Sequence, residues 1–266
     1  QEKEKAPPQK EKARSKRRLG RRKGMTVYED ERLDDLQWGG LELIQKKDAY
    51  CFTSDAVLLA NSVKAGARDR AIDLGAGSGI LSILLAAKRG CKVTAVEFQP
   101  WAAELCRRNA RLNSLEDKIS VFEGDIKGCS AALGAGAFDV AVCNPPYYKA
   151  GSGETRGDMR SALSRHESTC TLSDLAAETA ELLREGGRLY MVYKTERLAE
   201  ARTALSVCGL EPKELTMICP KEGSRPDTFI VCAKKGGRSG IIFKNLVVYN
   251  DDGSLSSEAE KLYGKK

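Results

Sequence analysis

The chain contains 266 residues, of which 41% are hydrophobic and 30% charged, and its net charge is +7. This length suffices for one large α/β domain that buries its core without disulfide bonds, and no run approaches the roughly 18 apolar residues of a membrane span. Nine scattered cysteines without a C-x-x-C pair, together with a single histidine, argue against a zinc site or a Ser-His-Asp triad and are typical of a reducing cytoplasm. We therefore expect a cytoplasmic protein with no metal and no membrane segment.

The positive charge is concentrated at the N-terminus. Residues 1–24 hold 11 Lys/Arg and 3 Asp/Glu, a local charge of +8, so the rest of the chain carries −1. This segment has no apolar periodicity, and we predict a disordered basic tail. The tail either adds salt-sensitive affinity for RNA phosphates or is solvated and dispensable.

The remainder, residues 25–266, is predicted to be a single domain. Residues 25–69 form an N-terminal extension, with a short strand, a turn and a helix between Leu41 and Ala60. From residue 70 onward, short apolar runs alternate with helical patterns, which indicates a parallel sheet flanked by helices. The predicted strands are Arg70–Leu74, Lys92–Glu97, Ile119–Phe122, Phe138–Cys143 and Arg188–Tyr193, followed by an antiparallel pair at Leu215–Cys219 and Thr228–Ala233.

Helices are predicted between these strands. They are Ile80–Lys88, a helix beginning at Pro100, Thr171–Leu183 ended by Gly186-Gly187, and Glu196–Cys208. In the helix that begins at Pro100, an apolar inner face runs from Trp101 to Leu115, and Arg108 and Asn109 interrupt it. Residues 148–169, rich in Gly, Ser and Arg, are predicted to form a flexible substrate loop.

A glycine-rich loop, residues 73–79 (DLGAGSG), joins the first of these strands to the helix after it. Glycines there let the backbone approach a ligand closely, and the helix N-terminus offers N–H groups. Glu97, at the end of the next strand, is placed for its carboxylate to accept both hydroxyls of a ribose. Ile80 stands where a dinucleotide fingerprint needs its third glycine, and no Lys-Ser/Thr follows as a P-loop requires.

The spacing D-x-G-x-G-x-G resembles instead the S-adenosylmethionine (SAM) loop of class I methyltransferases. This resemblance implies a Rossmann-like fold: a mostly parallel seven-stranded sheet with helices on both faces and an antiparallel edge strand. It also implies that Asp125, after the third strand, meets the adenine amino group of the cofactor. The cofactor-binding residues predicted in this core are Asp73, Gly75, Ala76, Gly77, Gly79, Glu97, Phe98, Gln99, Asp125, Ile126 and Asn144.

The turn Asn144-Pro145-Pro146-Tyr147 directly follows the fourth strand, at the sheet edge where open α/β folds bind ligands. The two prolines make the turn rigid. The Asn144 side-chain oxygen and the Pro145 carbonyl can accept both hydrogens of an amine, which favours a pyramidal nitrogen whose lone pair faces the SAM methyl group. Tyr147 can stack on a planar substrate. We predict these four residues as catalytic; the turn alone fits adenine-N6, guanine-N2 or glutamine-N5 as the acceptor.

Further segments resemble the bacterial tRNA(Val) adenine-N6 methyltransferases, which modify the adenine next to the anticodon. The likeness covers roughly residues 30–264, with departures at Ser164 and Lys244-Asn245. The matching segments are residues 31–36 (ERLDDL), 43–45 (LIQ), 50–52 (YCF), 55–60 (DAVLLA), 165–167 (RHE), 211–213 (EPK) and a strand at Val247–Tyr249 before a terminal helix. The resemblance implies that Tyr50, Phe52 and Asp55 border the methionine end of SAM. In the long loop, Arg156, Arg160 and Arg165 suit contact with RNA phosphates or form a solvated lid.

The prediction is therefore a SAM-dependent methyltransferase acting on adenine N6 in a tRNA anticodon loop, as a monomer or weak dimer. One alternative is a protein glutamine-N5 methyltransferase of release factors. It is disfavoured because such enzymes usually carry a helical domain before the SAM core. The other alternative is a non-catalytic RNA-binding protein that keeps the SAM fold.

Overall fold

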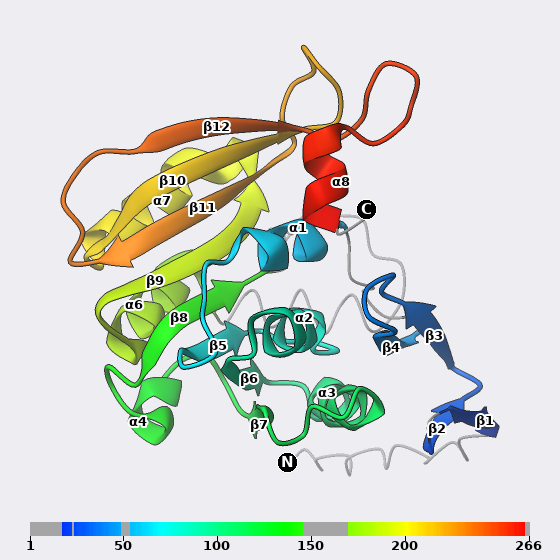
Figure 1. Ribbon diagram of the computed structural model, residues 1–266. Helices are drawn as coiled ribbons and strands as arrows, with labels where there is room; N and C mark the ends of the chain where they lie inside the picture. Colours follow the sequence, from blue (N-terminus) through cyan, green and yellow to red (C-terminus); the bar gives the residue numbers. More distant parts are fainter. Residues whose placement is uncertain (1–17, 23, 49–53, 146–169, 264–266) are drawn as a thin grey trace, which may run out of the picture.

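The computed structural model describes residues 18–22, 24–48, 54–145 and 170–263. An eight-stranded sheet forms its centre (Figure 1). In spatial order the strands are β12 (Ile242–Val247), β10 (Leu210–Cys219), β11 (Thr228–Lys235), β9 (Leu183–Lys194), β8 (Phe138–Cys143), β5 (Arg70–Leu74), β6 (Lys92–Glu97) and β7 (Ile119–Glu123).

The strand directions confirm a Rossmann-like sheet but correct two details. Only β11 runs against its neighbours, and it lies between β9 and β10 rather than at the edge. The sheet has eight strands instead of seven, because β12 pairs in parallel with β10. β12 also replaces the strand predicted at Val247–Tyr249. Four of its residues are exposed, so it lacks the apolar alternation that marks a strand in sequence.

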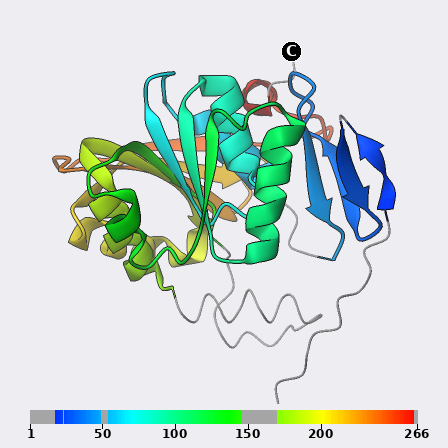
Figure 2. The same cartoon turned by 90° about the horizontal axis from the view of Figure 1, so that it is seen from below.

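Helices cover both faces of the sheet (Figures 1 and 2). One core packs α1 (Ser54–Ser62), α2 (Ile80–Arg89), α3 (Pro100–Leu112) and α8 (Ser257–Tyr263) against one face. The other packs α4 (Cys129–Leu133), α6 (Leu172–Leu182) and α7 (Leu198–Val207) against the opposite face, with the short 3₁₀ helix η1 (Thr195–Arg197) before α7. Neighbouring residues of β5, Ala71 and Ile72, are fully buried in different cores. Burial on both faces explains why the strands read as continuous apolar runs.

The predicted stop at Gly186-Gly187 is wrong, because α6 ends at Leu182 and β9 begins at once. The register between β8 and β9 shifts over this stretch, since Phe138 pairs with Leu183 and Val140 with Arg188. Gly186 has a φ of 76°. The two glycines therefore allow an irregularity in the pairing of β8 with β9, and they do not end the preceding helix. Glycine commonly marks such irregularities inside strands.

Two hairpins precede the sheet: β1 (Arg18–Arg22) with β2 (Met25–Tyr28), and β3 (Glu31–Asp35) with β4 (Glu42–Lys46). The predicted disorder is therefore wrong for residues 18–22, where the basic tail ends in a strand. Gly24, with a φ of 79°, supplies the backbone conformation that a tight hairpin turn needs. Within the described ranges, no helix is long and apolar enough to cross a bilayer.

Candidate active site

The glycine-rich loop follows β5 at the carboxyl edge of the sheet. Gly75, Gly77 and Gly79 have φ angles of 78°, 55° and 89°, a region that residues with a Cβ rarely adopt. A Cβ at Gly79 would lie 2.5 Å from Cys106 Sγ, whereas one at Gly77 would meet no atom within 4 Å. Gly79 is therefore required for packing against α3, and the backbone at Gly77 faces open space that a ligand can fill.

Glu97 ends β6 beside this loop and is 7% exposed. Its Oε2 accepts the Gly77 N–H at 2.8 Å, and its Oε1 accepts the Gln99 N–H at 2.8 Å. Each carboxylate oxygen offers more than one acceptor position. The Glu97 carboxylate therefore fixes the glycine loop and the start of the following turn through both of its oxygens.

Asp73 lies beneath the loop and is fully buried. Its Oδ2 accepts the N–H of Ser82 at 3.1 Å and the hydroxyl of Ser82 at 2.7 Å, which ties the loop to the first turn of α2. Its Oδ1 is buried without a hydrogen-bond partner among the described residues. Burial raises the pKa of Asp73 to about 7; the Ser82 hydrogen bonds lower it, and the charge of Glu97 raises it.

This raised pKa predicts a specific pH dependence of stability. Between about pH 4 and 7 the folded protein holds a proton on Asp73 that the unfolded chain has lost, so the free energy of unfolding falls as the pH rises through this window and is flat above it. Three pKa units correspond to about 4 kcal/mol. Asp73→Asn should remove this component in urea denaturation at pH 5 to 8. Asp117→Asn, on an exposed side chain, is the matched control and should keep it; an unchanged pH slope in Asp73→Asn would contradict the assignment.

The end of β7 brings the third acidic residue to the same edge. The Gly124 N–H donates to the Glu97 carbonyl at 3.0 Å, which holds the ends of β6 and β7 together. Asp125 is half-buried, and its Oδ1 accepts the Lys127 N–H at 3.0 Å. The Ile126 Cδ1 would lie 4.0 Å from a Cβ at Gly75. Ile126 therefore stands beside the glycine loop, and Asp125 directly precedes Ile126 at the same sheet edge.

The two predicted residues after Glu97 differ in exposure. Phe98 is 50% exposed. Gln99 is held in place, because its Oε1 accepts the Trp101 Nε1–H at 2.7 Å.

Asn144 and Pro145 follow β8 and are both half-buried. The thiol of Cys143 donates to the Leu74 carbonyl at 3.1 Å, across β8 and β5. Because Leu74 directly precedes the glycine loop, this contact places Asn144 next to Gly75 at the same sheet edge. The structure thus brings Asn144 and Pro145, which we call the reactive corner, to the same sheet edge as the glycine loop, as the order of strands and loops predicts.

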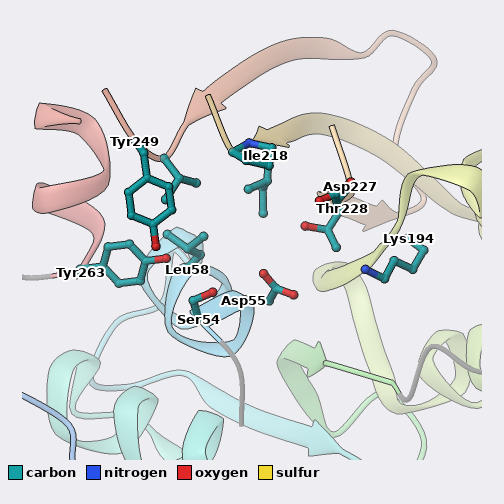
Figure 3. A pocket seen from close by; sticks show the side chains of 11 residues that line it. Ser54, Asp55, Leu58, Lys194, Ile218, Asp227, Thr228, Tyr249 and Tyr263 are labelled. Atoms are coloured by element: carbon teal, nitrogen blue, oxygen red, sulfur yellow. The ribbon is translucent and has the colours of Figure 1, made fainter. Parts of the chain in front are cut away.

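Other predicted site residues lie outside the described residues: Tyr50, Phe52, Pro146, Tyr147, Arg156, Arg160 and Arg165. Asp55, the remaining one, stands in the first turn of α1. It lines a pocket of about 200 Å³ at the carboxyl edge of the sheet (Figure 3).

Sequence reasoning missed one residue that supports the site, Asn109 in α3. Its amide nitrogen donates to the carbonyls of Ser78 and Ile44, both at 2.9 Å, and its Oδ1 accepts the Ile44 N–H at 2.7 Å. Asn109 is fully buried. It links the glycine loop to strand β4, and its only sequence signal is a polar residue inside an apolar helical face.

Comparison with known proteins identifies the family. Residues 52–207 match the model of the methyltransferase small domain. The tRNA1(Val) (adenine(37)-N6)-methyltransferase of Shewanella amazonensis is 30% identical over 184 residues, which are 69% of this chain and 78% of the relative. The chain therefore belongs to the methyltransferase small-domain family.

Two further relatives define the extent of the likeness. The tRNA1(Val) (adenine(37)-N6)-methyltransferase of Porphyromonas gingivalis is 33% identical over 150 residues, 55% of this chain, and the match spans only 58% of that relative. The crystal structure of a predicted O-methyltransferase from Agrobacterium tumefaciens superposes with a TM-score of 0.64 and 25% identity, covering 79% of this chain and 95% of that one. The class I methyltransferase fold is therefore confirmed.

Proposed function

We propose that this methyltransferase family member transfers the methyl group of SAM to N6 of an adenine next to the anticodon of a tRNA. The observation that carries the proposal is the position of the Asn144–Pro145 corner beside the glycine loop, fixed by the contact between Cys143 and Leu74. The names of the relatives from Shewanella amazonensis and Porphyromonas gingivalis support the choice of acceptor. They give no support to the glutamine-methyltransferase alternative.

The residues present fit SAM as the cofactor. The backbone at Gly77 faces open space, Glu97 presents carboxylate oxygens beside it, and Asp125 stands at the next strand end. In this arrangement Glu97 would hold the ribose and Asp125 the adenine amino group. SAM supplies a sulfonium methyl group, which is electrophilic, so the protein's task is to orient a weak nucleophile towards it.

Asn144 and Pro145 perform that orientation. An adenine N6 lone pair is delocalised into the ring and is a poor nucleophile. When the Asn144 Oδ1 and the Pro145 carbonyl accept the two N–H groups, the nitrogen is held pyramidal and its lone pair is freed for attack. The methylated nitrogen is cationic and acidic, so it loses its proton without a strong general base.

The cellular and domain assignments belong to the same proposal. The cysteines among the described residues are all free, which supports a reducing cytoplasm. We assign residues 25–266 to a single methyltransferase domain preceded by the basic tail, with tRNA as its partner.

The proposal is tested with the full chain, radiolabelled SAM and three acceptors. These are an unmodified tRNA1(Val) transcript, the same transcript with the adenine next to the anticodon replaced by guanine, and a bacterial release factor. We expect label only in the first, recovered as N6-methyladenosine by nucleoside mass spectrometry. Label in the release factor, or equal label in both transcripts, would contradict the proposal.

A further inference from the structure

The pocket in Figure 3 lies at the carboxyl edge of the sheet, beyond the reactive corner. Its walls come from the ends of β9, β10 and β12, the start of β11, the first turn of α1 and the end of α8. Its volume is about 200 Å³. Asp55 is the one predicted site residue among the described residues that lines it, and the mechanism derived above gives Asp55 no step.

The order of the strands places the pocket relative to the corner. The glycine loop follows β5, on one side of β8, and the pocket begins at β9, on the other side. Thr228, on β11, is two strands from β8, which is about 10 Å at a strand spacing of about 4.8 Å. A base whose amine is held at Asn144 does not reach this far wall, although Lys194, at the near wall, ends the strand next to β8. The pocket therefore lies on the acceptor's side of the reaction but is open to a different group.

The floor of the pocket is apolar, with Leu58, Ile218 and Val248 among its lining residues. Tyr249 stands at its rim, and its side chain is 43% exposed. Tyr263 is held by a side-chain hydrogen bond with Ser54. An exposed aromatic ring over an apolar floor suits a flat ligand that stacks on it. A tyrosine ring can stack on any nucleobase, whatever the sequence.

The polar lining indicates which end of a nucleotide fits. Asp55 and Asp227 contribute carboxylates, and Lys194 contributes one ammonium group (Figure 3). Two carboxylates repel a phosphodiester, but they accept hydrogen bonds from the amino and imino N–H groups of a base. The lining therefore favours the edge of a base over a phosphate.

We propose that this pocket binds a second base of the same RNA, one that bears an amino group and neighbours the methylated adenine, stacked on Tyr249 and bonded to Asp227. This inference rests on the proposed function. It gives the protein a means of recognising its RNA at a nucleotide that is not modified. Anticodon loops can splay neighbouring bases out of the stack, so that two pockets on one sheet edge can each take one.

The test measures Tyr249→Ala and Asp227→Asn in the full chain with the tRNA1(Val) transcript. Tyr249→Ala removes the stacking ring and Asp227→Asn removes the charged acceptor, so we expect the KM for tRNA to rise about tenfold in each variant. The kcat and the Kd for SAM, measured by calorimetry, should change less than about twofold. The matched controls are Phe243→Ala, which removes an exposed aromatic ring on β12, and Asp251→Asn, which changes another exposed aspartate; both should keep the wild-type KM.

Transcripts with an abasic nucleotide on either side of the target adenine identify the bound base. At one position the abasic change should raise the KM of the wild-type protein at least tenfold, and the KM of Tyr249→Ala, which has already lost the stacking contact, by a smaller factor. An unchanged KM in both variants, a weakened Kd for SAM in place of a raised KM, or fully additive abasic effects would each overturn the proposal. Failure of the function itself is distinguishable, because the wild-type protein would then label no tRNA.

Discussion

Asn144→Ala is expected to lower the rate of methyl transfer to tRNA by about 10²-fold or more, as the loss of one positioned transition-state contact does in other enzymes. Asn144 stands at the end of β8, beside the glycine loop but not in it. Its side chain is proposed to accept a hydrogen bond from the reacting amine, which matters most while the nitrogen becomes pyramidal. The kcat should therefore fall, while the Kd for SAM by calorimetry should change little.

Two further variants sharpen this prediction. Asn144→Asp keeps an acceptor oxygen at the same place, so its rate should lie between those of the wild type and Asn144→Ala. Asn245→Ala removes an exposed asparagine on β12 and should leave the rate unchanged. Near-normal turnover in Asn144→Ala would remove Asn144 from the mechanism, and a large loss of SAM affinity would assign it to cofactor binding instead.

Arg108→Ala is expected to destabilise the protein by about 3–5 kcal/mol, the usual cost of leaving one partner of a buried ion pair alone. The Arg108 guanidinium donates to both carboxylate oxygens of Glu31, at 2.7 and 2.8 Å, and also to the Thr26 carbonyl. It packs over the Tyr28 ring at 5.0 Å. The side chains of Arg108 and Glu31 are only 8% and 1% exposed, so water cannot replace the lost contacts.

The pKa of Glu31 reports the same pairing. Burial raises it, but the hydrogen bonds from Arg108 and from the Tyr28 N–H, with the charges of Arg108 and Lys46, lower it more, so that the pKa lies below its ordinary value. The pair therefore contributes stability that is present above the unfolded pKa of about 4.5 and is lost as the pH falls through the lowered folded pKa.

The neighbouring residue supplies a matched control for Arg108→Ala. Arg107 pairs with Glu123 at 3.1 Å, but their side chains are 38% and 39% exposed, and such pairs contribute about 0–1 kcal/mol. Arg107→Ala should therefore change the free energy of unfolding in urea by less than about 1 kcal/mol. In Arg108→Ala, hydrogen exchange should also increase in β2 and β3, which Arg108 joins to α3. Equal effects of the two variants would contradict a special role for the buried pair.

Local patterns are sufficient for the centre of this protein. Strands β5, β6 and β8 and the second half of β9 are predictable, because burial on both faces makes each a short apolar run between polar turns. The glycine loop is also recognisable, since positive φ angles and close approach by a ligand restrict its residues to glycine. Parallel strands end at a common edge, so the order of strands and loops alone assigns the carboxylates of Glu97 and Asp125 and the Asn144 corner to one site.

The peripheral strands and the supporting contacts cannot be predicted in this way. β12 has mostly exposed side chains and depends on pairing with β10, a partner reached only after the chain has folded back. Arg108 and Asn109 look like interruptions of an apolar helical face. Their hydrogen bonds go to Glu31 and to Ile44, which are 77 and 65 residues away along the chain.

The sequence by itself therefore determined the class of fold and the chemistry of the reactive edge, because both depend on local conformation and on the order of strands and loops. Only the tertiary structure decided where β11 lies, how the N-terminal hairpins attach, and that a pocket lies at the same sheet edge beyond Asn144. A buried polar side chain is stable only when distant segments supply its partners. Those partners become neighbours through packing, which no local pattern encodes.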